Sequence, residues 1–241
     1  MKLSVIIPSF NEEARIAKTL RAVDAYLKRQ DYDYEILVVS DGSKDTTCDV
    51  VRGLEESIAF LRLIANKENH GKGFVVRQGM LEATGDVRLF MDADNATTID
   101  HVERMFPHFK SGADVVICSR DIPGSIVAVS QSLFRRRLGD VFNLIVQTFS
   151  GLWGLWDTQC GFKAFSAQAT LAVFKQARIN RWAFDVELLV IAKLLGYKIV
   201  EVPVTWVNDP HSKVKFSGMV KMLLEVMQIR WNVITGKYEK K

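Results

Sequence analysis

Two aspartates separated by one residue follow directly on an apolar run, in the segment RLFMDADNAT that spans residues 88–97. Side chains alternate along a strand, so Asp92 and Asp94 are expected on one side, with Ala93 pointing away. Carboxylates suit Mg²⁺ and Mn²⁺, which are commonly held by one or two of them together with substrate phosphates. The pair therefore predicts a site for Mg²⁺ or Mn²⁺ that offsets the charge of a diphosphate leaving group. A simpler alternative stays open, in which Asp94 and Asn95 only form an Asx turn or cap a helix.

Two common phosphate-binding loops can be tested against the same sequence. A dinucleotide fold needs the pattern GxGxxG after its first strand, and the corresponding turn here, PSFNEE, has no glycine. A P-loop needs GxxxxGK followed by Ser or Thr. At NHGKG the earlier glycine position is Asn66, and Gly73 follows the lysine. Both patterns fail, which favours a metal-dependent scheme.

The elements that must position these aspartates alternate through the first half of the chain. Five apolar runs have the length and β-branched bias of strands buried on both faces, namely LSVIIPS, YEILVVSD, FLRLIAN, VRLFMDAD and DVVICSR. A helical pattern follows the first run, with Asn11 as its expected N-cap and Glu12 and Glu13 in its first turn. The alternation predicts an α/β fold with a mostly parallel sheet flanked by helices. Ligands of such sheets bind beyond the carboxyl ends of the strands, so PSFNEE, SDGSKD, MDADN and SRD are expected to line one crevice.

The second half is less regular. It predicts a helical stretch after Ser132, a helix over AFDVELLVIAKLLG, a strand over YKIVEVPVTWV and a last helix from about Ser217. No Pro-, Gly- or Ser-rich linker marks a boundary, so residues 1–241 are expected to form a single domain. The last of its segments, residues 216–241, is expected to be a C-terminal amphipathic helix and tail.

Composition narrows the classes of function. The 241 residues are 48% hydrophobic, and their net charge of +4 gives no case for a nucleic-acid partner. Three cysteines without a CxxC pair favour a reducing compartment over disulfides or zinc. The apolar N-terminus reads as a strand rather than a signal peptide, and the longest uncharged run, residues 141–156, falls short of the roughly 18 residues of a spanning helix. We expect a soluble chain that touches a membrane.

Five segments in this order and spacing resemble family 2 glycosyltransferases of the GT-A fold, and among them the polyprenyl-phosphate glycosyltransferases. These segments are SVIIPSFNEE, VVSDGSKDTT, NHGKGFVVRQGM, MDADNA and DTQCGFKAF. The last of them, with RWAFDVELL, is more similar to the glucosyl branch that uses dolichyl phosphate than to the mannosyl branch. The resemblance implies an inverting, metal-dependent hexosyltransferase, with residues 1–120 as its nucleotide-sugar-binding half and residues 121–215 as its acceptor-binding half. It favours UDP-glucose as donor and a dolichyl or other polyprenyl phosphate as acceptor, with GDP-mannose as the alternative donor.

The resemblance also implies roles for individual residues. Asp92 contacts the ribose or the metal, Asp94 the metal, and Lys72, in its glycine-flanked loop, the sugar nucleotide. The nucleotide base and ribose are lined by Pro8, Phe10, Glu12 and Asp41. Further substrate contacts are expected at Asn11, Gly71, Ala93 and Gln159. Mannosyl members carry Gln at the position of Ala96, so a third metal ligand must come from elsewhere, with His211 as a candidate, or from water.

For the acceptor, Asp157 stands where many members of the family have a general base. An acceptor phosphate with a second pKa of about 6 arrives largely deprotonated, so Asp157 is expected to position substrate instead. Cations must then hold the phosphate, and Arg120 and Arg135 are the main candidates. The others are Arg136, Arg137, Lys213 and Lys215, although an arginine run can also be a solvated face.

A polyprenyl acceptor requires contact with a membrane surface. In the last helix one polar stripe is expected at Lys221, Glu225, Gln228 and Asn232, and the broad apolar remainder suits core, a protein partner or lipid. Together with GLWGLW it favours peripheral attachment on the cytoplasmic side. Glucosyl relatives in eukaryotes carry an N-terminal membrane segment that this sequence lacks, so a homodimer or an anchoring partner is a further expectation.

Two other classes compete with a glycosyltransferase. A sugar nucleotidyltransferase also pairs a strand with aspartates, but it usually carries a glycine-rich loop where this chain has PSFNEE. A non-catalytic sugar-nucleotide sensor is disfavoured by the joint presence of Asp92, Asp94, Arg120 and Asp157.

Overall fold

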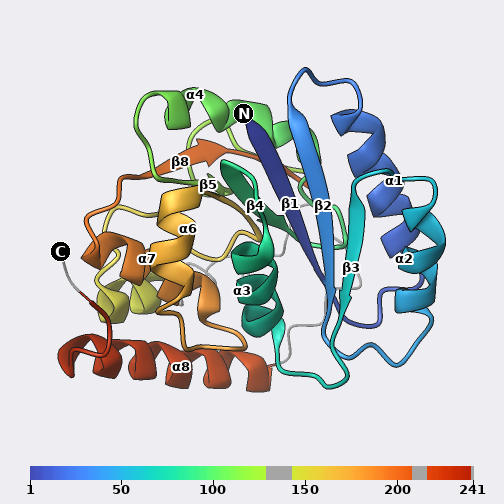
Figure 1. Ribbon diagram of the computed structural model, residues 1–241. Coiled ribbons are helices and arrows are strands. Elements are labelled where there is room, and N and C mark those ends of the chain that lie inside the picture. Colours follow the sequence, from blue (N-terminus) through green and yellow to red (C-terminus); the bar gives the residue numbers. More distant parts are fainter. Residues whose placement is uncertain (129–142, 208–215, 240–241) are drawn as a thin grey trace.

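A seven-stranded sheet forms the centre of the protein, with helices on both faces (Figure 1). The computed structural model describes residues 1–128, 143–207 and 216–239. The strand order is β3-β2-β1-β4-β7-β5-β8, and all neighbours are parallel except β7, which is antiparallel to β4 and β5. The strands are β1 (Lys2–Ser9), β2 (Asp33–Ser40), β3 (Leu61–Ala65), β4 (Val87–Met91), β5 (Val115–Ser119), β7 (Phe162–Ser166) and β8 (Ile199–Pro203). A separate parallel pair joins β6 (Ile126–Val127) to β9 (Thr205–Trp206).

Two apolar layers fill the space between the sheet and its helices. One contains side chains of α1 (Ile16–Leu27), α2 (Thr47–Glu55), the 3₁₀ helix η1 (Ile99–Arg104) and α4 (Phe106–Lys110). The other contains side chains of α3 (Lys72–Glu82), α6 (Ala167–Phe174), α7 (Phe184–Leu194) and α8 (Phe216–Ile234). Burial of both faces explains why the central strands are apolar runs without alternation.

The five strands predicted in the first half are confirmed, as are the helix over α7 and the last helix. Two elements differ from expectation. The segment FKAFS forms β7, which the sequence did not indicate because a lysine interrupts a short run. The predicted strand over residues 197–207 is divided into β8 and β9. Of the helical stretch expected after Ser132, residues 129–142 lie outside the described part, and residues 143–150 are helical.

Asn11 is not the N-cap of α1, which corrects the prediction. The helix begins at Ile16, so Glu12 and Glu13 precede it, and Asn11 takes a left-handed conformation with φ of 55°. Asparagine tolerates this region because its side chain can bond locally. Here its Oδ1 accepts a hydrogen bond from the Lys44 backbone N–H at 2.9 Å, which ties the loop after β1 to the loop after β2.

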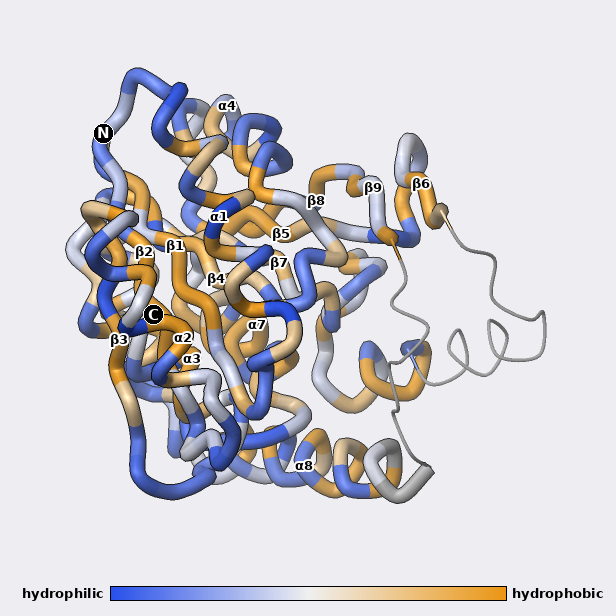
Figure 2. Tube along the Cα trace, turned by 90° about the vertical axis from the view of Figure 1, so that its right-hand side faces the viewer, coloured by the Kyte–Doolittle hydropathy of each residue, from blue (hydrophilic) through white to orange (hydrophobic). Residues whose placement is uncertain are grey.

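The carboxyl ends of the parallel strands lie at one edge of the sheet. In Figure 1, β1 runs downward from the N-terminus, so this edge is the lower one, and α8 crosses the same side of the molecule. Figure 2 shows α8 along the same edge after a quarter turn. Within the described ranges, no helix is long and apolar enough to span a membrane.

Candidate active site

The loop after β4 carries Asp92 and Asp94, and it is a turn rather than a continuation of the strand. The strand ends at Met91, and Asn95 turns the chain with φ of 55°. Ala93 is buried, and its carbonyl accepts a hydrogen bond of 2.7 Å from Thr19 Oγ1. Both carboxylates are partly exposed, but the turn places them there, and not the strand alternation that the sequence predicts.

The expected Asx turn is also present. Asp94 Oδ1 accepts the backbone N–H of Ala96 at 3.0 Å, so this carboxylate shapes its own loop. Burial raises the pKa of Asp94, although the hydrogen bond from Ala96 acts against the shift, and the charge of Asp92 adds to it. The Asx turn therefore does not prevent Asp94 from also binding a metal ion.

Lys72 is the closest cation to this turn among the interactions described. It is the first residue of α3, not a loop residue as expected, and its amine forms an ion pair with the Asp92 carboxylate. Desolvation acts to lower the pKa of Lys72, but Asp92, Asp185 and Asp94 raise it overall. The amine is therefore a permanent positive charge beside two candidate metal ligands.

Asp41 and two glycines hold Lys72 in place. Asp41 is buried, and its carboxylate accepts the backbone N–H groups of His70 at 2.7 Å and Gly71 at 2.9 Å. A Cβ on Gly71, which has φ of 106°, would lie 2.4 Å from the carbonyl oxygen of Asn180. A Cβ on Gly73 would lie 2.6 Å from Cβ of Phe184. These glycines therefore serve close packing against residues 179–184, in addition to any approach of ligand to the backbone.

Gly161 lies directly behind Asp92. A Cβ at this position would approach Asp92 Oδ2 to 2.2 Å, so no larger residue fits unless the carboxylate moves. The segment DTQCGF thus packs against the aspartate turn. Nothing in the sequence singles out Gly161, because only its contact with Asp92 shows that a glycine is required there.

The donor set fits a hard divalent cation. Asp92 and Asp94 supply carboxylate oxygens, and Oδ1 of Asn95 is buried without a hydrogen-bond partner. No group of three or more His, Cys, Asp and Glu side chains suited to a metal occurs in the described ranges. A pair of carboxylates is compatible with Mg²⁺ or Mn²⁺, because such ions are commonly held by one or two carboxylates together with substrate phosphates and water. His211, the candidate third ligand, lies outside the described residues.

Asp157 and Arg120 form the second cluster at this edge. Arg120 follows β5, and its Nε and one terminal nitrogen donate to the two Asp157 oxygens at 2.6 and 2.9 Å. The backbone N–H of Arg120 and that of Gln159 also donate to this carboxylate, at 3.0 and 3.1 Å. Burial acts to raise the pKa of Asp157, but the charge and hydrogen bonds of Arg120 hold it below its ordinary value.

This pairing changes the expected role of Arg120. Its guanidinium donates to Asp157 and lies 5.3 Å from the centroid of the Trp206 ring, and its contact with an acceptor phosphate stays a prediction. Glu201 of β8 supports the same loop by accepting the backbone N–H groups of Trp156 and Asp157 at 3.0 Å. The sequence analysis missed Trp206 and Glu201, since both are more than 40 positions from Asp157 or Arg120.

Of the remaining predicted residues, three lie in β1 or in the loop that follows it, and the basic ones lie outside the described part of the chain. Phe10 is exposed at the end of β1, Pro8 is buried in β1 opposite Val39, and Glu12 pairs with Arg15. Three buried hydroxyls at the same edge, those of Ser9, Ser119 and Thr158, have no partner, as expected where a polar ligand or water binds. Arg135, Arg136, Arg137, Lys213 and Lys215 lie outside the described residues.

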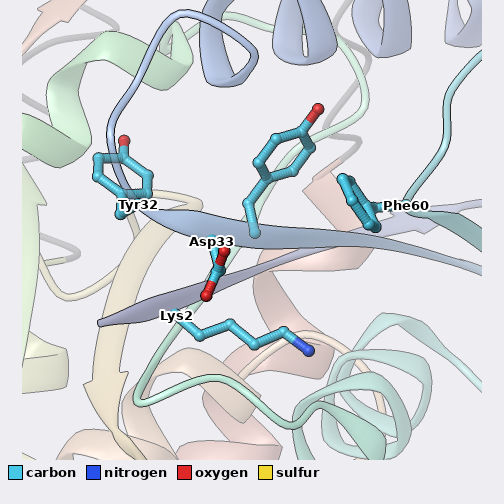
Figure 3. Close-up of a pocket in the computed structure, with 5 residues that line it drawn as sticks. Lys2, Tyr32, Asp33 and Phe60 are labelled. Atoms are coloured by element: carbon cyan, nitrogen blue, oxygen red, sulfur yellow. The ribbon is translucent and has the colours of Figure 1, made fainter.

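A pocket of about 350 Å³ lies elsewhere (Figure 3). It is lined by Lys2, Asp33, Tyr32, Tyr34 and Phe60. Lys2 and Asp33 are the first residues of β1 and β2, so the pocket is at the amino ends of these strands. The aspartate turn and the Arg120–Asp157 pair lie at the carboxyl ends of the strands, so the pocket is separate from the candidate active site.

Comparison with known proteins now adds to this geometry. The family model described as glycosyl transferase family 2 matches residues 4–170. The chain belongs to glycosyltransferase family 2.

Curated relatives of this family 2 glycosyltransferase cover nearly all of it. A protein of Trichomonas vaginalis named dolichyl-phosphate beta-glucosyltransferase is 37% identical over 234 residues, which is 93% of this chain and 69% of the relative. The human protein of that name is 35% identical and covers 98% of this chain and 77% of its own length.

Solved structures confirm the GT-A fold of this family 2 glycosyltransferase. Glucosyl-3-phosphoglycerate synthase of Mycobacterium tuberculosis, in complex with Mn²⁺, uridine diphosphate and phosphoglyceric acid, superposes with a TM-score of 0.70 at 18% identity. The match covers 98% of this chain and 78% of that structure. The predicted family and α/β fold are therefore correct.

Proposed function

We propose that this chain transfers glucose from UDP-glucose to the phosphate of a dolichyl or other polyprenyl phosphate, with inversion at the sugar carbon. The names of relatives at 33–37% identity support both the sugar and the acceptor. The observation that carries the proposal is the carboxylate of Asp157, which Arg120 holds bidentately. A carboxylate held in its charged form is a weak base. This suits a phosphate acceptor, which needs no general base.

The donor binds at the carboxyl ends of β1, β2 and β4. The exposed ring of Phe10 suits stacking with the base, and the Lys72 amine suits the diphosphate. Asp92 and Asp94 hold Mg²⁺ or Mn²⁺, which when bound offsets the negative charge on the leaving diphosphate. The other donor contacts proposed are Pro8, Asn11, Glu12, Asp41, Gly71, Ala93 and Gln159.

The transfer step forms one bond and breaks one. A phosphate oxygen of the acceptor attacks C1 of glucose, and the bond from C1 to the diphosphate oxygen breaks, with its electron pair leaving on UDP. No proton must be removed, because the phosphate is ionised near neutral pH. Asp157 orients the reacting groups, Arg120 fixes Asp157, and Arg135 and Lys213 are proposed to hold the incoming phosphate.

Helix α8 provides the proposed membrane contact. Its exposed side chains Val220, Leu224, Met227, Trp231 and Ile234 recur at helical spacing and form a single stripe, which we call the outer stripe. Lys221 and Arg230 flank it and are exposed. The acidic residue of α8, Glu225, points inward and accepts the backbone N–H groups of Trp182 and Ala183. An apolar stripe with basic flanks suits an anionic lipid surface on the cytoplasmic side.

A donor and acceptor panel tests the function. We expect transfer from UDP-glucose to polyprenyl phosphate and none to the unphosphorylated polyprenol, measured as a radiolabelled lipid product. Preferential use of GDP-mannose would favour the mannosyl alternative. Formation of a sugar nucleotide from UTP and glucose 1-phosphate would favour a nucleotidyltransferase.

A further inference from the structure

A lysine without solvent access lies in the middle of the sheet. Lys163 of β7 pairs with Phe90 of β4 and with Ile117 of β5, and its side chain is 0% exposed. Its amine donates to Asp185 Oδ1 at 2.6 Å and to the carbonyl of Cys160. Burying an ion pair costs more desolvation energy than burying an apolar pair of the same size. Packing alone therefore does not explain why Lys163 and Asp185 occupy these positions.

Asp185 connects this lysine to the candidate active site. It lies in the first turn of α7, where the helix dipole favours a negative charge. The charge of Asp185 acts on Lys72, whose amine forms the ion pair with Asp92 and lies 5.8 Å from the Phe184 ring centroid. Positive and negative groups therefore alternate from the core to the aspartate turn, in the order Lys163, Asp185, Lys72 and Asp92.

We propose that Asp185 is a positioning residue for the donor site, a buried carboxylate fixed by Lys163 that holds the Lys72 amine in place once a ligand occupies Asp92. In the free protein Asp92 is the direct partner of Lys72. A metal ion at Asp92 competes with Lys72 for that carboxylate, and the charge of Asp185 then keeps the Lys72 amine in place beside the donor diphosphate. The Asp185 carboxylate itself cannot move with the Lys72 side chain, because Lys163 and α7 hold Asp185 in place. This inference rests on the proposed function, since it assigns Lys72 to the donor diphosphate.

The other explanation is that the ion pair only joins β7 to α7. Glu187 provides the matched control, because it lies two residues along the same helix and is also buried. Its carboxylate accepts the backbone N–H groups of Arg178 and Ile179 and the hydroxyl of Tyr238, and no interaction described links it to Lys72. Neutralising either carboxylate disturbs α7, but only one change alters the support of Lys72.

The experiment compares Asp185→Asn with Glu187→Gln by calorimetric titration with UDP, once with Mn²⁺ and once with chelator. Asparagine keeps an oxygen for Lys163 but loses the charge. We expect Asp185→Asn to weaken UDP binding about 10–100-fold, the range found for residues that support a ligand-binding group. The KM for UDP-glucose should rise while the KM for polyprenyl phosphate stays unchanged, and Glu187→Gln should bind UDP as the unaltered protein does.

Two results would overturn the inference: UDP affinity of Asp185→Asn within about twofold of the unaltered protein, a change too small for a lost charge contact, or an equal loss in Glu187→Gln. If Asp185→Asn does not fold, the double variant Lys163→Met/Asp185→Leu removes both charges in an apolar pair. It should fold and show the same loss, and normal UDP binding by it would equally refute the proposal. Failure of the proposed function is distinct, because the unaltered protein would then not bind UDP.

Discussion

At the scale of single residues, the carboxylate of Asp157 is defined by its hydrogen bonds. It accepts from the Arg120 guanidinium at two atoms and from two backbone N–H groups, which leaves little capacity to accept a proton. Because its pKa is lowered, the stability it contributes is complete above the pKa of an unfolded aspartate, about 3.9, and is lost as the pH falls through the lower folded value. Asp157 therefore stays charged throughout the neutral range.

Replacing Asp157 by Asn should separate positioning from proton transfer. A general base contributes about 10²–10⁴-fold to rate, and we expect Asp157→Asn to lose much less than that. Asp157→Ala should lose more, because it leaves Arg120 unpaired, at a cost of about 3–5 kcal/mol in stability. The pH–rate profile of Asp157→Asn should still rise near pH 6 with the ionisation of the acceptor phosphate. If the Asn variant is as inactive as the Ala variant and this limb is lost, Asp157 is the base and a hydroxyl acceptor fits better.

A single methyl group at residue 161 should disturb the donor site. The Cβ of Gly161→Ala would meet the Asp92 carboxylate, so we expect Asp92 to move, Mn²⁺-dependent UDP binding to be lost, and stability to fall by about 1–3 kcal/mol. Gly53→Ala is the control, since nothing lies within 4 Å of its Cβ in α2, and it should stabilise by about 0.5–1 kcal/mol. Calorimetry and thermal unfolding measure both. Unchanged UDP binding by Gly161→Ala would contradict the assigned contact.

At the scale of elements, the polar stripe predicted in α8 only partly faces solvent. Of the predicted polar stripe, Lys221 and Gln228 are exposed, but Asn232 is buried and donates to the Tyr238 hydroxyl. Glu225 accepts the backbone N–H groups of Trp182 and Ala183, just before α7. The exposed face is instead the outer stripe, while Met222, Val226 and Ile229 face the core. Because Glu225 and Asn232 satisfy groups of neighbouring elements, polar spacing alone does not mark the solvent side of α8.

Removing apolar surface from the outer stripe should weaken membrane binding without unfolding the protein. Leu224→Ser and Trp231→Ser each remove a side chain worth about 1.5–3 kcal/mol when buried, which is roughly tenfold or more in partition to lipid. Co-sedimentation with vesicles of phosphatidylcholine and an anionic phospholipid measures the effect. Gln228→Ser, on the same helix and exposed, should bind vesicles normally. Equal binding by all three variants would place the membrane contact elsewhere.

At the scale of the whole molecule, one sheet joins the two halves of the chain. Strand β7, from the second half, lies between β4 and β5 of the first and pairs with both. The loop that precedes β7 holds Asp157 and Gly161, so the acceptor and donor clusters are built on a common set of strands. Residues 1–120 are therefore not expected to fold apart from the remainder.

Thermal unfolding should then be one cooperative transition that ligand shifts as a whole. UDP with Mn²⁺ at about 100 times its Kd should add about 2.7 kcal/mol of stability, and chelator should remove most of that gain. Differential scanning calorimetry measures both. Two separate transitions, of which only one responds to UDP, would contradict the single domain, and an equal shift with chelator present would contradict the metal assignment.

The sequence by itself determined the five strands of the first half, the helices over α7 and α8, and the edge of the sheet where polar residues follow those strands. These follow from local patterns, since apolar runs specify buried strands and polar residues follow each carboxyl end. The family was also predicted correctly, because several motifs in fixed order are far more specific than the pair Asp92 and Asp94 alone. Local pattern was misleading at Asn11, where a contact with the loop after β2 replaced the expected helix cap.

Only the tertiary structure decided which charges pair and which face of α8 is exposed. Arg120 and Asp157 are 37 positions apart, Lys163 and Asp185 are 22 apart, and Glu225 reaches the backbone of Ala183 across 42. No periodicity connects such residues, because each contact arises from how separate elements pack on the sheet. Either face of an amphipathic helix can pack against the core. In α8 the packing is decided by polar groups of neighbouring elements, which need hydrogen-bond partners when they are buried.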